Sequence, residues 1–224
     1  MANLFATSIG KKVIMSLSGL FLISFIIVHL CVNILLIFGD GTLFNKAAHF
    51  MDTNPVVSIV EPILGIGFLV HIIYSIIITT RNYFARPVKY KLSNPGANST
   101  WASRNMFVLG GLILTFLIVH IANFFWKIKF GSVPYITING EQVHDTYTLV
   151  SQLFINYWWY DLLYIAGAIF LGLHLSHGFW SGFQTIGLDN DKWKPRLSIA
   201  GTVFAVIIAL GFSIIPLYFL IFFN

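Results

Sequence analysis

Four histidines lie in four separate apolar stretches of this 224-residue sequence, one in each stretch: His29, His71, His120 and His174. An imidazole surrounded by hydrocarbon is costly, so each of these histidines needs a partner or a function. One histidine on each of four helices is an arrangement by which a helical bundle can hold two haems, each through a pair of axial histidines. Haem ligation is therefore the first chemistry that the sequence indicates.

The composition is that of a membrane protein. Hydrophobic residues make up 57% of the chain and charged residues only 9%, whereas a soluble domain carries about 25% charged residues. The single cysteine, Cys31, cannot build a disulfide framework, a zinc site or an iron–sulfur cluster alone. The net charge of +5 could suggest a nucleic-acid partner, but the basic residues cluster in short segments between apolar stretches, which is typical of membrane orientation. We expect no nucleic-acid partner.

About 20 apolar residues are needed to cross a bilayer. Five stretches meet this requirement, and they predict transmembrane helices at about 13–38, 56–80, 105–127, 157–182 and 197–223. We therefore expect an all-α integral membrane bundle of five helices and a single domain over 1–224. The first four helices would form the di-haem core, and the fifth, which has no histidine, would pack outside it.

Basic residues predict the orientation of the bundle. Ten of the thirteen lysines and arginines lie in the N-terminal segment, in 81–104 or in 183–196, which all fall on one side of the membrane. Because cytoplasmic segments are enriched in basic residues, we expect a cytoplasmic N-terminus and a C-terminus on the outer face.

The depth of each histidine then predicts which histidines face each other. At 1.5 Å per residue, His29 lies roughly 24 Å from the inner end of the first helix, and His71 lies roughly 21 Å from the outer start of the second. His120 falls in the outer half of the third helix, and His174 falls in the inner half of the fourth. Depth therefore pairs His29 with His120 near the outer face and His71 with His174 near the inner face.

Other interpretations of the histidines stay open. A membrane histidine can be a hydrogen-bonded packing residue or part of a proton path, as in a proton-coupled transporter or channel. His174 and His177 share a helix face, but no HExxH motif or third ligand accompanies them as a zinc site would require. We expect His177 to make a polar contact near the inner surface, such as one to a haem propionate. His49 and His144 are expected in outer loops.

Glu61 is the one carboxylate that the sequence clearly places in an apolar stretch, beside Pro62. Burial would disfavour its charged form, so Glu61 could take up and release protons in the outer third of the second helix. The alternative is a residue at a helix start whose side chain reaches water.

Several sequence motifs resemble one family. The matching stretches are HLCVN (29–33), FNKAAHFMD (44–52), the VHIIYSI run around His71, VHIANF (119–124) and GLHLSHGFWSGFQTIG (172–187). With these motifs the chain resembles the cytochrome b membrane-anchor subunit of succinate dehydrogenase and fumarate reductase, in its single-chain, five-helix, two-haem form.

The resemblance implies axial ligands at His29 with His120 and at His71 with His174. It also implies a quinone site near the outer haem that uses Glu61, with menaquinone as the expected quinone. His49 and Asp52 could pass the proton from Glu61 to water. The implied partners are a flavoprotein subunit and an iron–sulfur subunit on the cytoplasmic face of a bacterial inner membrane, within respiratory complex II. The cytochrome b of quinol–cytochrome c reductase is a poorer match, because it places two ligands on each of two helices.

Overall fold

The computed structural model describes residues 7–85 and 99–223. Within these ranges five helical segments are long and apolar enough to cross a membrane: Ser8–Ile37, Pro55–Phe84, Met106–Phe130, Trp158–Thr185 and Trp193–Phe222. Their limits differ from the predicted ones by no more than five residues. The chain is a multi-pass membrane protein, and its predicted all-α class is confirmed for these segments.

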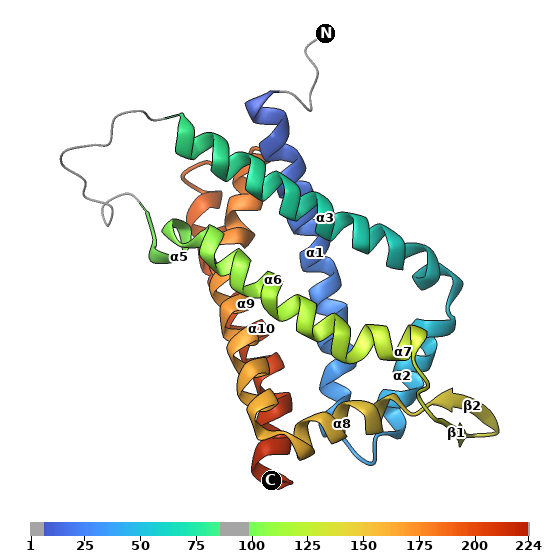
Figure 1. Cartoon of the computed structure of the whole chain (residues 1–224). Coiled ribbons are helices and arrows are strands. Elements are labelled where there is room, and N and C mark those ends of the chain that lie inside the picture. Colours follow the sequence, from blue (N-terminus) through green and yellow to red (C-terminus); the bar gives the residue numbers. More distant parts are fainter. Residues whose placement is uncertain (1–6, 86–98, 224) are drawn as a thin grey trace.

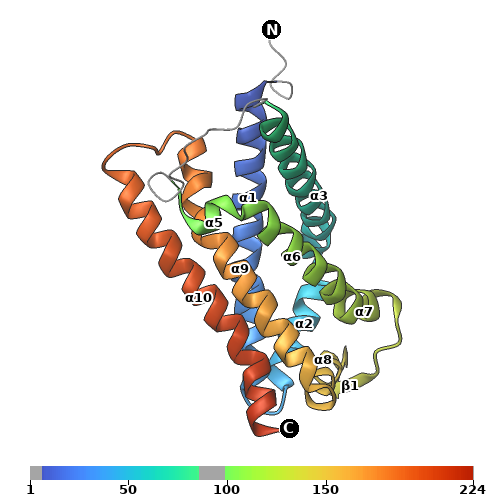
Figure 2. The same ribbon diagram turned by 60° about the vertical axis from the view of Figure 1, so that its left-hand side comes forward.

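The five spans alternate in direction and form a bundle (Figures 1 and 2). They are built on α1 (Ser8–Asn33), α3 (Pro55–Phe84), α6 (Met106–His120), α9 (Trp158–Thr185) and α10 (Trp193–Phe222). The most extensive helix contact joins α9 to α10, whereas α3 packs mainly on α1. Figure 2 places α10 at one edge of the bundle and α3 at the other, and in Figure 1 α3 crosses in front of α1.

Local sequence signals define where several helices begin. The Thr7 hydroxyl accepts a hydrogen bond from the Gly10 amide at 3.0 Å and caps α1. The Asn54 side chain caps α3 by accepting from the amides of Val56 and Val57, and Pro55 occupies the first helical position. Such caps satisfy amides that have no partner within the helix, and proline at this position loses nothing because its missing N–H would be unpaired anyway.

The end of the bundle that carries the C-terminus has a capping layer, built from two of the segments that connect the spans. The layer consists of α2 (Thr42–Thr53), α8 (Thr146–Asn156) and a hairpin of β1 (Tyr135–Ile138) with β2 (Glu141–His144). The remaining short elements are η1 (Ile34–Ile37), α5 (Trp101–Arg104), the π-helical turn η2 (Ile121–Phe125) and α7 (Trp126–Phe130).

His49 and His144 were expected in loops, and the structure corrects this expectation. His144 ends strand β2 of the hairpin, and His49 lies on helix α2. The two-residue turn at Asn139 and Gly140 has positive φ at both positions, 54° and 86°. Asn-Gly favours this turn because both residues adopt such angles at low cost. An Asn-Gly pair between ITI and EQVH is thus a hairpin signal that the sequence analysis missed.

Apolar side chains join the capping layer to the spans. Near the C-terminal end, Leu36, Phe44, Phe154 and Phe219 belong to one buried cluster that connects η1, α2, α8 and α10. A second cluster contains Leu175 on α9 with Ala205 and Ile208 on α10. The capping layer is therefore packed against the bundle by the same kind of contact that holds α9 to α10.

Gly172 predicts how sensitive the α9–α10 contact is to side-chain size. A Cβ at Gly172 would lie 2.7 Å from the Ala209 Cβ and 3.1 Å from the Ala205 carbonyl oxygen, whereas a Cβ at Gly111 would meet nothing within 4 Å. We expect Gly172→Ala to destabilise the purified protein by about 1–3 kcal/mol, because overpacking forces backbones apart. Gly111→Ala should leave stability unchanged or raise it. Thermal unfolding in one detergent measures both, and equal midpoints for the two variants would contradict close packing at Gly172.

Candidate functional site

The four membrane histidines form two facing pairs. The ring centroids of His29 on α1 and His120 at the end of α6 are 5.6 Å apart, with an angle of 86° between the ring planes. The centroids of His71 on α3 and His174 on α9 are 6.3 Å apart, with an angle of 68°. Four different helices therefore contribute one imidazole each, and each imidazole meets a partner from another helix.

Aromatic side chains surround the His29–His120 pair. Phe25 stacks on His29 at 5.1 Å between centroids, and Phe212 of α10 approaches the same ring at 5.7 Å. Phe116 and Phe124 lie on either side of His120 along its own helix, at 5.7 and 5.4 Å. The pair thus lies in an apolar, aromatic environment that favours a flat hydrophobic group over water.

A π-helical turn begins directly after His120. It places Asn123, which is 9% exposed, so that its amide donates to the Tyr164 hydroxyl of α9 at 3.3 Å. The Tyr164 ring in turn contacts the His120 ring at 5.9 Å between centroids. Single π-helical turns occur often at functional sites, and here the turn connects α6 to α9 beside one of the four histidines.

Polar contacts differ among the four imidazoles. His71 Nδ1 lies 3.3 Å from the Ser18 hydroxyl of α1. His29 Nδ1 lies 3.3 Å from the side-chain amide of Asn33 on the same helix, and this amide also donates to the His29 carbonyl. Among the described residues, the buried Nδ1 atoms of His120 and His174 have no hydrogen-bond partner. One ring in each pair is therefore hydrogen-bonded and the other is not.

His177 lies one turn beyond His174 on α9. Its Nδ1 is also buried and has no partner in the described part of the chain, and its ring contacts Trp180 edge-to-face at 5.2 Å. An unpaired buried nitrogen is unfavourable, so His177 has the capacity to hydrogen-bond a polar group that approaches from outside the chain.

Glu61 lies in an ion-pair cluster that the sequence did not indicate. Lys129 on α7 contacts Asp52 of α2 at 2.7 Å and Glu61 of α3 at 3.2 Å, and each of these side chains is about one-third exposed. Glu61 is thus half-buried with a cationic partner rather than isolated in hydrocarbon. The cluster connects three elements at the C-terminal end of the bundle.

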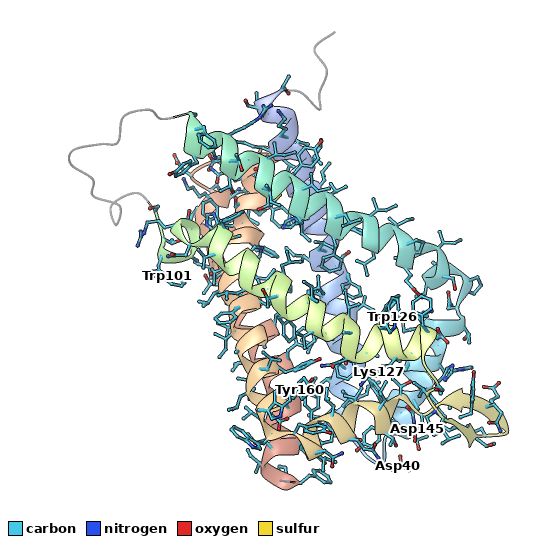
Figure 3. All side chains as sticks on the ribbon, viewed as in Figure 1. Asp40, Trp101, Trp126, Lys127, Asp145 and Tyr160 are labelled. Carbon is cyan, nitrogen blue, oxygen red and sulfur yellow. The ribbon has the colours of Figure 1, made fainter. Side chains whose placement is uncertain are left out.

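Asp161 is a polar residue that the sequence analysis missed, and it corrects the statement that Glu61 is the one carboxylate clearly placed in an apolar stretch. Asp161 lies in the first turn of α9 and is 0% exposed. Neither carboxylate oxygen has a hydrogen-bond partner among the described residues. Figure 3 labels its neighbour in sequence, Tyr160, near the start of α9. The signal in the sequence was a carboxylate directly after the WWY run at 158–160.

Asp145, which caps α8 within the capping layer (Figure 3), shows the opposite environment. Its carboxylate accepts from the Asn45 side chain at 3.1 Å and from the Thr148 amide at 3.2 Å. Burial alone would raise the pKa of Asp145, but these hydrogen bonds outweigh it and hold the pKa below its ordinary value. Because the folded state lowers this pKa, Asp145 stabilises the protein at neutral pH and loses that contribution as the pH falls through the folded pKa.

Comparison with known proteins finds a relative that aligns with most of the chain. The chain is 26% identical over 189 residues to the succinate dehydrogenase cytochrome b558 subunit of Bacillus subtilis (strain 168), and the alignment covers 84% of each chain. No protein-family model matches the chain, and no solved structure matches it. The relative confirms the resemblance to the cytochrome b subunit of succinate dehydrogenase that the sequence motifs indicated.

The two aspartates predict opposite responses to substitution. Asp161→Asn keeps the shape of the side chain and removes an unpaired buried carboxylate, so the thermal unfolding midpoint should stay the same or rise. Asp145→Ala removes a helix cap and should lower stability by about 1 kcal/mol. Thermal unfolding of both variants in detergent tests this, and a lower midpoint for Asp161→Asn would show that the Asp161 carboxylate has a favourable partner.

Proposed function

We propose that this chain is the membrane anchor and electron-transfer subunit of a succinate:quinone oxidoreductase, with residues 1–224 forming a single di-haem domain. Two b-type haems would connect a membrane quinone with the flavoprotein and iron–sulfur subunits. The observation that carries the proposal is the presence of two facing histidine pairs, contributed by four helices. The similarity to a cytochrome b558 subunit supports the same function.

The donor set fits haem better than a bare metal ion. Each pair offers two imidazoles, and the described residues contain no group of three or more His, Cys, Asp or Glu side chains that could hold a metal. A structural zinc site needs four protein ligands. A haem brings four nitrogens of its own, so it needs only the two axial ligands that each pair supplies.

The arrangement of the rings also fits. The imidazoles of each pair face each other, with centroids 6.3 Å apart for His71 and His174 and 5.6 Å apart for His29 and His120. Each pair could therefore supply two imidazole nitrogens to one haem iron. Glycines lie beside the His71–His174 pair. A Cβ at Gly19 would lie 3.3 Å from His71 Cε1, and one at Gly110 would lie 3.9 Å from His174 Cε1.

The haems would supply one-electron redox chemistry, and the residues of the chain would bind and tune them. His29, His71, His120 and His174 would be the axial ligands. Phe25, Phe116, Phe124 and Phe212 surround the His29–His120 pair and would exclude water from it. The unpaired Nδ1 of His177, when it carries the ring proton, could donate a hydrogen bond to a haem propionate.

We place the quinone site beside the His29–His120 pair, with Glu61 as the group that accepts a proton from the quinol. Oxidation of a quinol releases two protons, so the site needs a titrating acceptor within reach of a hydroxyl. Lys129 holds the Glu61 carboxylate through a 3.2 Å contact. Asp52, paired with the same lysine at 2.7 Å, offers a second carboxylate towards which the proton could leave. Menaquinone is the quinone that the family resemblance favours.

The basic end of the bundle is the proposed docking face for the soluble subunits. Lys11, Lys12, Arg81 and Arg104 belong to the N-terminal end, together with the α9–α10 connection that carries Lys192. Arg86, Lys89 and Lys91, which contributed to the same prediction, lie outside the described residues. The excess of basic residues favours a cytoplasmic location for this end, in the inner membrane of a bacterium.

Replacement of single histidines tests the proposed pairs. His71→Ala or His174→Ala should remove one haem spectral component, and His29→Ala or His120→Ala should remove the other, because each haem needs both of its ligands. Reduced-minus-oxidised spectra of the purified complex measure this. If His29→Ala and His71→Ala abolish the same component, the pairing is wrong. A wild-type chain with no haem spectrum would instead favour a proton-coupled transporter that uses the histidines as a relay.

Glu61→Gln tests the proton acceptor. The substitution keeps the shape of the side chain but removes its basicity, so quinone-linked turnover should fall roughly 10²-fold while both haems remain. Succinate oxidation with artificial acceptors should be unaffected. Lys129→Gln is the matched control, because it breaks the same ion pair but keeps the Glu61 carboxylate, and its loss should be much smaller. Normal quinone turnover in Glu61→Gln would move the site elsewhere in the complex.

A further inference from the structure

We propose that Ser18 is a positioning residue that fixes the proton of His71 on Nδ1 and thereby directs Nε2 towards His174. This inference rests on the proposed function, since it concerns one axial ligand of the haem at the His71–His174 pair. It adds a residue from α1, a helix that contributes no ligand to this pair.

The hydrogen bonds around Ser18 determine which group donates. The Ser18 hydroxyl donates to the Met15 carbonyl one turn earlier, at 2.9 Å. With its only hydrogen used there, the oxygen can only accept from His71 Nδ1, which lies 3.3 Å away. This contact therefore requires a hydrogen on Nδ1, and it leaves the Nε2 lone pair free for a metal.

Helix α1 also restricts the position of the His71 ring. Ser18 is 9% exposed, so water does not compete strongly for its oxygen. At the next residue, Gly19, an added Cβ would lie 3.3 Å from His71 Cε1 and 3.6 Å from Nδ1. Such a contact is tighter than normal packing, so the absence of a side chain at Gly19 lets α1 approach the ring. The His71 ring therefore packs against α1 at Ser18 and Gly19.

This contact distinguishes His71 from the other three histidines. Its hydrogen-bond partner comes from a different helix, whereas Asn33 contacts His29 from the same helix. The Nδ1 atoms of His120 and His174 have no partner in the described part of the chain. A ligand that donates its second ring proton is a better electron donor, which favours the oxidised metal. Ser18 should therefore lower the midpoint potential of one haem and leave the other unaffected.

The test compares Ser18→Ala with Ser24→Ala in the complete complex. Ser24 is a matched control, because it also lies on α1 and donates to the carbonyl three residues earlier, at 2.7 Å, but is exposed. The readouts are haem content, the midpoint potential of each haem and the electron paramagnetic resonance signal of each oxidised haem. The haem of the His71–His174 pair is identified as the spectral component that disappears in His174→Ala.

In Ser18→Ala we expect the midpoint potential of this haem to rise and its resonance signal to shift, while the other haem keeps both values. Ser24→Ala should match the wild type, and Ser18→Thr, which retains a hydroxyl, should restore the wild-type potential. Loss of only this haem in Ser18→Ala, with retention in Ser18→Thr, would also support the proposal. Two haems with wild-type potentials in Ser18→Ala would overturn it and leave the proposed function intact. A wild-type complex without haem in this chain would overturn both.

Discussion

The cost of a polar imidazole in an apolar bundle is the constraint on which the rest of the structure depends. Each of the four membrane histidines faces a histidine from another helix, so that His29 lies against His120 and His71 against His174. Ser18 and Asn33 contact one ring of each pair, whereas Nδ1 of His120 and of His174 has no hydrogen-bond partner among the described residues. These contacts bring together four helices that are predominantly apolar. The same four histidines therefore form the candidate site and make contacts between the helices of the bundle.

Helix α1 contacts both histidine pairs. It supplies His29 to one pair, and it approaches the other pair closely enough for Ser18 to contact His71 at 3.3 Å. Helix α1 packs against α3, α9 and α10, which gives it access to both histidine pairs. Rigid support at this position is what a redox centre needs, because the orientation and hydrogen bonding of an axial ligand tune its metal.

The sequence predicted the spans, because apolar length determines them. The rings that it paired by depth, His29 with His120 and His71 with His174, face each other in the structure. Other contacts between distant segments could not be predicted in this way. Lys129 and Glu61 meet because α7, at the end of the third span, lies against the start of α3. Whether the first turn of α9 is covered depends likewise on α8 and its neighbours, so the burial of Asp161 carries no signature in the local sequence. The Asn139–Gly140 turn, by contrast, was predictable and was missed.

The central claim is that four histidines on four helices hold two haems, and the pyridine haemochrome assay of the purified chain, with protein measured by amino-acid analysis, tests it most directly. The account predicts two b-type haems per chain, each six-coordinate and low-spin. One haem or none per chain would contradict it, because one of the facing histidine pairs would then require a different explanation.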